Sequence, residues 1–381
     1  MDNNNQELGL VMSGGGARAA YQVGFLRGLA AHHNEVDFPI ITGVSAGAIN
    51  AAFLANEKGS FKSRVDNLAK VWANLTIDNV FRVDVPSIAL HVGGWAIRLV
   101  MGRASSQVKV RAMVDTEPLQ EFLEAIFQAE DGQLNGIKAN IANGNIRGIA
   151  ITASSYSTGQ SITWVKAENV KDWERAHRKS VQSDIRVEHI MASASLPLFF
   201  PSIQVKGDWY GDGGIRLTAP LSPAIHLGAR RILAISTRYL PSTEEQETDM
   251  IDDYPPPAQV LGSMLNALFL DVFDNDALRL ERINSLIEYQ EQENEQGGEL
   301  EPVKLLLLRP SKNLGQMANQ FEANLPGAFR FMTRGLGTKE TRSNDFLSMV
   351  MFQHDYISEL MDLGYKDAES RIDELNTFFQ K

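Results

Sequence analysis

Cysteine is absent from the 381-residue sequence, and its absence excludes several kinds of chemistry at once. The chain can form no disulfide, bind no metal through thiolates and use no cysteine nucleophile. This composition fits a reducing compartment, so we expect a cytoplasmic protein, with a cysteine-free periplasmic protein as the alternative. Residues 1–7 are polar and acidic, and a cleaved signal peptide is therefore not expected.

Positive charge is also scarce, since 36 Lys and Arg residues stand against 47 Asp and Glu residues, for a formal net charge of −11. Binding to nucleic acid over a wide surface needs clustered Lys and Arg, so we expect no nucleic-acid partner. No apolar run reaches the roughly 18 residues that a membrane-spanning helix needs. Hydrophobic residues still make up 44% of the chain, enough for a sizeable core. Any membrane contact would be peripheral and mainly apolar.

The first part of the chain alternates between short apolar runs and helical patterns. Residues 8–12 form an apolar run that stops at a glycine loop, and a helical pattern follows over 18–31. Residues 38–42 form a second apolar run, and a second helical pattern follows over 46–56. This order predicts an α/β fold with a mainly parallel sheet and right-handed crossovers.

Further strands and helices are predicted along the rest of the chain. Strands are expected over 148–155, 161–166, 203–210, 231–236 and 303–308, and helices over 219–227, 258–289, 343–360 and 367–379. We interpret residues 1–381 as a single domain with a helical excursion over 60–135. An acidic linker and a long helix are expected over 242–301, and a late core strand with C-terminal helices over 302–381.

A glycine-flanked serine lies where the second predicted strand ends. The run Gly43-Val44-Ser45-Ala46-Gly47 fits the pattern G-x-S-x-G. A sharp strand-to-helix turn lifts such a serine hydroxyl off the sheet and brings the flanking residues too close together for side chains. The N-terminus of the following helix favours negative charge that develops there. We therefore predict that Ser45 is a nucleophile, and a structural turn is the alternative.

The loop over residues 13–16 follows the first predicted strand and contains three consecutive glycines. Consecutive glycine N–H groups can converge on one oxygen, as an oxyanion hole requires. The same loop with Ala19 also fits the dinucleotide fingerprint G-x-G-x-x-A. That fingerprint expects an acidic residue at the end of the second strand, where Thr42 and Gly43 stand instead. Binding of NAD(P) is therefore a distant alternative.

A serine nucleophile needs a base, and none of the seven histidines lies in a recognisable motif. The better candidate is Asp212, in the run Asp212-Gly213-Gly214, because the two glycines leave room around its carboxylate. A predicted hairpin over 203–210 precedes it and could hold it rigidly. Taken alone, Asp-Gly-Gly is also a common tight turn. No motif for a metal or an organic cofactor is visible, and we expect neither.

These motifs together resemble the patatin-like phospholipase family. Its pattern begins with a glycine-rich loop ending in Arg, continues with G-x-S-x-G and ends with D-G-G. In this chain the corresponding residues are Gly14-Gly15-Gly16-Ala17-Arg18, Gly43–Gly47 and Asp212-Gly213-Gly214, and residues 192–201 resemble the segment before the family's catalytic Asp. The similarity covers roughly residues 8–240. Ser13 stands where many members have Asp, and Ala19 where they usually have Gly.

The resemblance implies a three-layer α/β/α fold and a serine lipid acyl hydrolase of the phospholipase A or lysophospholipase type. Asp212 would take the Ser45 proton without a histidine, and Ser45 would form an acyl-enzyme with a phospholipid or lysophospholipid. A catalytically silent acyl-binding protein of the same fold is the second hypothesis. The sequence does not reveal the oligomeric state or the need for an activating partner.

The resemblance also implies roles for the residues around the nucleophile. Backbone N–H groups of Gly15 and Gly16 would hold the oxyanion, with those of Gly14 and Ala46 as further candidates. Arg18 would brace the glycine loop, and the alternative is a solvated residue in the first helical turn.

Residues 88–101 form the most apolar excursion outside the predicted sheet and include Trp95. As a helix this segment would be about 21 Å long, which is short for spanning a bilayer. A lid or interfacial helix beside an acyl pocket and an ordinary buried helix are equally favoured. Residues 266–273 could line the same pocket, although a place in the core is favoured for them.

Overall fold

The protein is described from a computed structural model, which covers residues 7–82, 112–242, 245, 254–269, 271–293, 301–335, 337–338, 341 and 343–380. Ten described strands form one sheet. They are β1 Leu8–Met12, β2 Ile40–Val44, β3 Gly148–Ser155, β4 Ser161–Ala167, β5 Glu174–Arg175, β6 Arg178–Gln182, β7 Ile203–Val205, β8 Asp208–Asp212, β9 Arg231–Ile235 and β10 Lys304–Leu308.

The sheet has the order β10-β9-β1-β2-β3-β4-β6-β5, with the β7–β8 hairpin attached to β3. The five strands from β10 to β3 are parallel to one another. Their sequences are nearly continuous apolar runs, as expected for strands that helices cover on both faces. An antiparallel partner, β4, follows β3 through a short turn, and β8 pairs antiparallel with the end of β3. The predicted α/β fold with a mainly parallel sheet is confirmed.

The helices are mostly amphipathic and cover both faces of the sheet. Their bounds are α1 Ala20–His32, α2 Ala46–Asn56, α3 Phe61–Ala73, α5 Glu117–Ile126, α6 Asn135–Ala142, α7 Val187–Ser193, α8 Ser222–His226, α10 Pro257–Phe269, α11 Asp271–Glu293, α12 Leu314–Asn319, α13 Gly327–Gly335, α14 Asp345–Val350, α15 His354–Ser370 and α16 Ile372–Phe379. Short 3-10 helices are η2 Gly16–Ala19, η3 Ile77–Asn79, η4 Gly213–Ile215 and η5 Glu322–Asn324.

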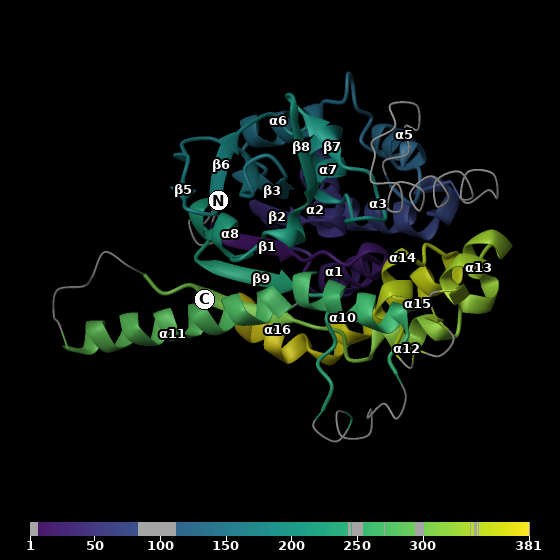
Figure 1. Cartoon of the computed structure of the whole chain (residues 1–381). Coiled ribbons are helices and arrows are strands. Elements are labelled where there is room, and N and C mark those ends of the chain that lie inside the picture. The colour runs from purple at the N-terminus through teal and green to yellow at the C-terminus, as the bar shows by residue number, and fades with distance from the viewer. Residues whose placement is uncertain are drawn as a thin grey trace.

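Two separate apolar cores lie on the two faces of the sheet. The larger core joins one face to α1, α2, α3, α7 and α15. The smaller core lies on the other face and includes residues of α8 and α11, such as Phe273. Figure 1 shows the later elements, α10 to α16 in green and yellow, together along the lower side of the view. No helix among the described residues is long and apolar enough to cross a membrane.

Most predicted elements are present, and the differences have local causes. The second strand begins at Ile40 instead of Phe38, because Pro39 precedes it and has no N–H to donate. The helix expected over 219–227 is the shorter α8, which begins at Ser222 with Pro223 in its first turn. The helix expected over 258–289 is confirmed over the residues that the structure describes, which are helical from Pro257 to Phe269 (α10) and from Asp271 to Glu293 (α11). Strands β5 and β6 were not predicted.

Two predicted segments differ in their outcome. Residues 88–101 lie outside the described residues. In the segment 266–273, the side chain of Phe273 is 1% exposed and belongs to the smaller core, so the favoured place in the core is confirmed for this residue.

Candidate active site

The register of β3 explains why two residues far apart in sequence meet. Val44, the last residue of β2, lies beside Thr152 of β3. The next residue of β3, Ala153, lies beside Asp212 at the end of β8. Strand β8 therefore pairs with β3 just beyond the point where β2 ends, and Ser45, the residue after Val44, faces the end of β8. The Ser45 hydroxyl donates a hydrogen bond to Oδ2 of Asp212 at 2.6 Å.

The backbone of Ser45 is strained, as the sequence motif predicts. Ser45 has φ 56° and ψ −131°, in a region that residues other than glycine rarely adopt. Its N–H donates to Oγ of Ser193 at 2.9 Å, and that hydroxyl donates to the Thr152 carbonyl at 2.6 Å. These two hydrogen bonds link the turn to β3 and α7, and they hold the serine backbone in this conformation.

The glycines on either side of Ser45 permit close contacts that a side chain would prevent. A Cβ at Gly43 would overlap the carbonyl oxygen of Gly47, because strand and helix turn sharply at this point. A Cβ at Gly47 would overlap the carbonyl oxygens of Met12 and Ser13. Helix α2 therefore begins directly against the end of β1, and this contact brings the serine turn and the glycine loop together.

Asp212 is fully buried, and its carboxylate has two hydrogen-bond donors. Oδ2 accepts from the Ser45 hydroxyl, and Oδ1 accepts from the Gly214 N–H at 2.9 Å. Its own N–H donates to the Ser195 carbonyl. Burial raises the pKa of Asp212 from the ordinary value of 3.8 to about 7, although both hydrogen bonds lower it in part. The carboxyl group can therefore exchange a proton near neutral pH.

The glycine loop is held to β9 by a buried threonine just after that strand. Oγ1 of Thr237 donates to the Gly14 carbonyl at 2.7 Å, and the backbone N–H of Thr237 donates to Oγ of Ser13 at 3.1 Å. In a trans peptide the next N–H points opposite to the carbonyl, so the N–H of Gly15 points away from Thr237. A Cβ at Gly14 would lie 2.9 Å from Cβ of Ser45, so the loop runs directly against the serine.

Arg18 is buried, and the alternative of a solvated residue is therefore wrong. Its Nε donates to Oγ of Ser348 at 2.6 Å, and its guanidinium pairs with Asp345 at 2.5 Å. Both partners belong to α14, in the C-terminal part of the chain. Next to this pair, a Cβ at Gly16 would overlap the Met349 carbonyl oxygen, and Gly16 has φ 57°. Arg18 therefore ties the end of the glycine loop to α14.

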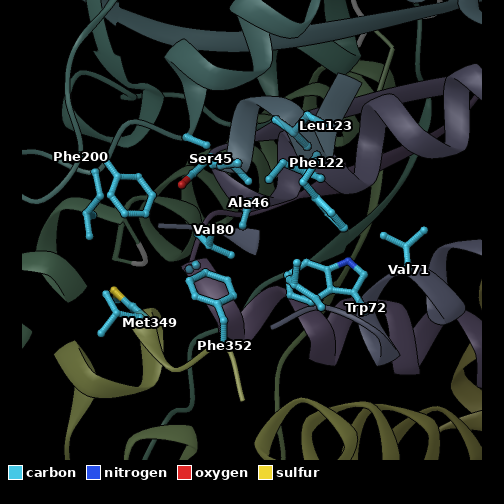
Figure 2. A pocket seen from close by; sticks show the side chains of 18 residues that line it. Ser45, Ala46, Val71, Trp72, Val80, Phe122, Leu123, Phe200, Met349 and Phe352 are labelled. Atoms are coloured by element: carbon cyan, nitrogen blue, oxygen red, sulfur yellow. The ribbon is translucent and has the colours of Figure 1, made fainter. Parts of the chain in front are cut away.

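An apolar pocket opens beside Ser45, with about 760 Å³ of empty space including its opening to solvent. Figure 2 shows Ser45 toward one end of the pocket, with Trp72 and Val71 at the opposite side of the view. The lining residues are Gly15, Gly16, Ser45, Ala46, Ile49, Val71, Trp72, Leu75, Val80, Leu119, Phe122, Leu123, Ala194, Leu196, Phe200, Met349, Val350 and Phe352. Not one of them is charged, so the pocket suits a hydrocarbon chain.

Two of the described histidines pack against tryptophan rings. His189 lies against Trp164 with ring centroids 4.4 Å apart and the rings tilted by 30°, and burial lowers its pKa to about 3. His226 stacks on Trp173. Among the residues that the structure describes, no group of three or more His, Cys, Asp or Glu side chains is placed to hold a metal ion.

Sequence reasoning missed two residues that support the site, Ser193 and Thr237. Ser193 lies in the segment 192–201, which resembles a family segment, but nothing in that resemblance assigned it a contact with the backbone of Ser45. Thr237 lies two residues after the end of β9, and no motif in the sequence marks it.

Comparison with known proteins places this geometry in a family. The sequence model of the patatin-like phospholipases matches residues 10–225. No curated protein matches the chain significantly.

Several solved structures are similar to the chain at low sequence identity. A human GIVD cytosolic phospholipase A2 is similar at 12% identity and a TM-score of 0.45, over 99% of this chain and 60% of that chain. VipD from Legionella pneumophila is similar at 13% identity and a TM-score of 0.34, over 94% of this chain and 67% of that one. The type III effector protein ExoU is similar at 15% identity and a TM-score of 0.23, over 90% of this chain and 76% of that chain.

The chain thus spans about 60% of the length of the human phospholipase with which it is compared. The family match covers the glycine loop, the serine turn and the Asp-Gly-Gly segment. Because residues 10–225 make up more than half of the 381 residues, the chain belongs to the patatin-like phospholipase family.

Proposed function

We propose that this chain is a serine lipid acyl hydrolase of the phospholipase A or lysophospholipase type, with Ser45 and Asp212 as its catalytic dyad. Family membership supports a lipid ester hydrolase in general. The observation that carries the finer proposal is the 2.6 Å hydrogen bond from the Ser45 hydroxyl to Asp212, beside an apolar pocket.

In the first half of the reaction, the Ser45 oxygen attacks the carbonyl carbon of a lipid ester and its proton passes to the Asp212 carboxylate. The tetrahedral intermediate collapses, the ester C–O bond breaks, and Asp212 returns the proton to the departing alcohol. In the second half, a water attacks the acyl-enzyme and gives its proton to Asp212. Collapse then releases the fatty acid and returns the proton to Ser45.

Negative charge on the carbonyl oxygen needs donors, and the glycine loop is placed to supply them. Gly15 and Gly16 line the same pocket as Ser45, and the Gly15 N–H points away from the Thr237 side of the loop. Helix α2 begins at Ala46, so its N-terminal N–H groups favour the same charge. Loss of one such donor typically costs about 10²-fold to 10³-fold in kcat.

The pocket supports a substrate with a long acyl chain and a headgroup outside it. The described residues that line the pocket carry no charge, so a phosphate or an ammonium group would lose its hydration without compensation beside them. A phospholipid or lysophospholipid fits this division, with its acyl chain inside and its polar part toward solvent. We place such a protein in the cytoplasm, with peripheral contact to the membrane that holds its substrate.

The test is labelling with a fluorophosphonate probe, followed by analysis of lipid products from phospholipid vesicles. The wild type should react with the probe and release fatty acid, whereas Ser45→Ala should do neither. Asp212→Asn should lose about 10³-fold or more in kcat, because no group would accept the serine proton. Ser63→Ala removes an exposed serine of α3 and serves as the control.

Two results would overturn the proposal. Wild-type turnover by Ser45→Ala would remove the nucleophile, and near-normal turnover by Asp212→Asn would remove the base. A protein that binds fatty acid but neither reacts with the probe nor releases product would be the silent acyl-binding protein instead.

A further inference from the structure

A chain of buried polar side chains connects Trp72, in the wall of the acyl pocket, to the glycine loop. The indole N–H of Trp72 donates to Oδ1 of Asn50 at 2.7 Å. Nδ2 of Asn50 donates to Oε1 of Gln22 at 3.0 Å. Nε2 of Gln22 then donates to the Ser13 carbonyl at 2.9 Å and to the Ile235 carbonyl at 3.2 Å. The chain thus crosses from α3 through α2 and α1 to the ends of β1 and β9.

Every side chain along this path is inaccessible or nearly so. Asn50 and Gln22 are 0% exposed, and Trp72 is 3% exposed. Water does not compete for these groups, so each must find its partner within the protein. A partly satisfied network of this kind costs more than an apolar core would.

The direction of the hydrogen bonds is fixed at both ends of the chain, by the Trp72 N–H at one end and by the Ser13 and Ile235 carbonyls at the other. Nδ2 of Asn50 also donates to the Ala19 carbonyl at 3.2 Å. An indole N–H can only donate, whereas a side-chain amide has one end that accepts and one that donates. Trp72 therefore requires Oδ1 of Asn50 to face it, which turns Nδ2 toward Gln22. The Nδ2 group of Asn50 needs an acceptor, which is Oε1 of Gln22, and so Nε2 of Gln22 faces the Ser13 carbonyl.

Ser13 is the point where this chain meets the proposed oxyanion donors. Its carbonyl accepts from Gln22, and its hydroxyl donates to the Gly14 carbonyl at 3.1 Å. The same hydroxyl accepts a hydrogen bond from the Thr237 N–H, so Gln22 and Thr237 both support Ser13. If the Gln22 amide were reversed, its Oε1 would face the Ser13 carbonyl and repel it, and the loop would shift from its place against Ser45.

We propose that Trp72 is a positioning residue for the glycine loop, acting through Asn50 and Gln22 on Ser13. This inference rests on the proposed function, because it assigns a catalytic consequence to the position of that loop. Trp72 also lines the acyl pocket on the side of the view opposite Ser45, beside Val71 (Figure 2). A pocket residue outside the dyad therefore controls the step at the ester carbonyl.

The test is Trp72→Phe with a short substrate, p-nitrophenyl butyrate, whose acyl chain is too short to rely on the far end of the pocket. Phenylalanine keeps most of the ring but lacks the N–H. We expect kcat per titrated serine to fall about tenfold, with KM within about twofold, since a displaced donor weakens the transition state and not substrate binding. Titration with a fluorophosphonate corrects for any unfolded fraction.

A double-mutant cycle with Gln22→Leu separates a chain from two independent sites. Trp72 and Gln22 share only Asn50, so independent effects on kcat should multiply. If they act in one chain, the double variant should be no slower than Gln22→Leu alone, because the loop has already lost its support. The control is Trp173→Phe, which changes a buried tryptophan of the other core.

The outcomes distinguish this inference from the proposed function. Wild-type kcat in Trp72→Phe, a change in KM alone, or multiplying losses in the cycle would overturn the positioning role while leaving the dyad in place. A tenfold loss in Trp173→Phe as well would show that any buried tryptophan has this effect, and would also overturn it. A wild type that hydrolyses no ester would overturn the proposed function first.

Discussion

Replacing Asp212 with asparagine should make the protein more stable and inactive at once. Asparagine has the same shape, and its amide can still accept the Gly214 N–H and donate to the Ser45 hydroxyl. It cannot carry the negative charge that Asp212 must carry at alkaline pH in a site without water contact. The substitution therefore removes a buried charge without leaving a cavity.

The size of the effect follows from the pKa of Asp212, which burial raises from 3.8 to about 7. The native state holds this proton more tightly than the unfolded chain does, so wild-type stability falls as pH rises from about 4 to about 7 and is flat above. Three pKa units at about 1.4 kcal/mol each correspond to about 4 kcal/mol. The amide of the Asp212→Asn variant does not titrate, so the advantage of the variant should grow by up to about this amount over the same pH window.

Denaturant unfolding at several pH values from about 4 to about 9 measures this difference. The free energy of unfolding of Asp212→Asn minus that of the wild type should rise by about 1.4 kcal/mol per pH unit and then level off near pH 7. Asp208→Asn is the control, because the exposed carboxylate at the start of β8 loses little hydration on folding. A difference that stays constant across this window would refute the reasoning from burial.

Three further predictions concern activity. Asp212 must be ionised to accept a proton, so kcat/KM should rise about tenfold per pH unit up to about pH 7 and level off above, and a flat profile would count against an aspartate base. Gly14→Ala places a Cβ 2.9 Å from that of Ser45 and should lower kcat at least about tenfold, whereas Gly327→Ala, with nothing within 4 Å, should not. Val71→Trp should lower kcat/KM for palmitoyl esters far more than for butyrates, and equal losses would place the acyl chain elsewhere.

The fold was largely predictable because its strands are local apolar runs. Residues 8–12 are all buried and residues 231–235 are buried except at the half-buried Arg231, and both apolar runs are visible in the sequence. Helix bounds were less certain where a proline lies in the first turn of a helix, as at α8. Strands β5 and β6 are rich in charged residues and lie at the sheet edge, so alternation does not reveal them.

The contacts around Ser45 were less predictable, because they join residues with no local relation. Arg18 pairs with α14 over 330 positions of sequence, and no periodicity predicts such a pair. Thr237 and Trp72 likewise act through partners on other elements. The meeting of Ser45 with Asp212 came from the family resemblance, and its structural cause is the register of β3, which sequence patterns do not contain.

Strand β3 supports both unfavourable features of this site. The left-handed backbone of Ser45 costs of order 1–3 kcal/mol. Its N–H bonds to the Ser193 hydroxyl, which in turn bonds to the Thr152 carbonyl of β3. The buried carboxylate of Asp212 is placed by pairing with the next residue of the strand, Ala153. Neighbouring residues of one central strand thus help to position both groups, together with α7, which carries Ser193, and α2, which begins directly after Ser45. Changes in β3 should therefore alter the hydroxyl–carboxylate distance more directly than changes in α5, which lines the pocket but holds neither group.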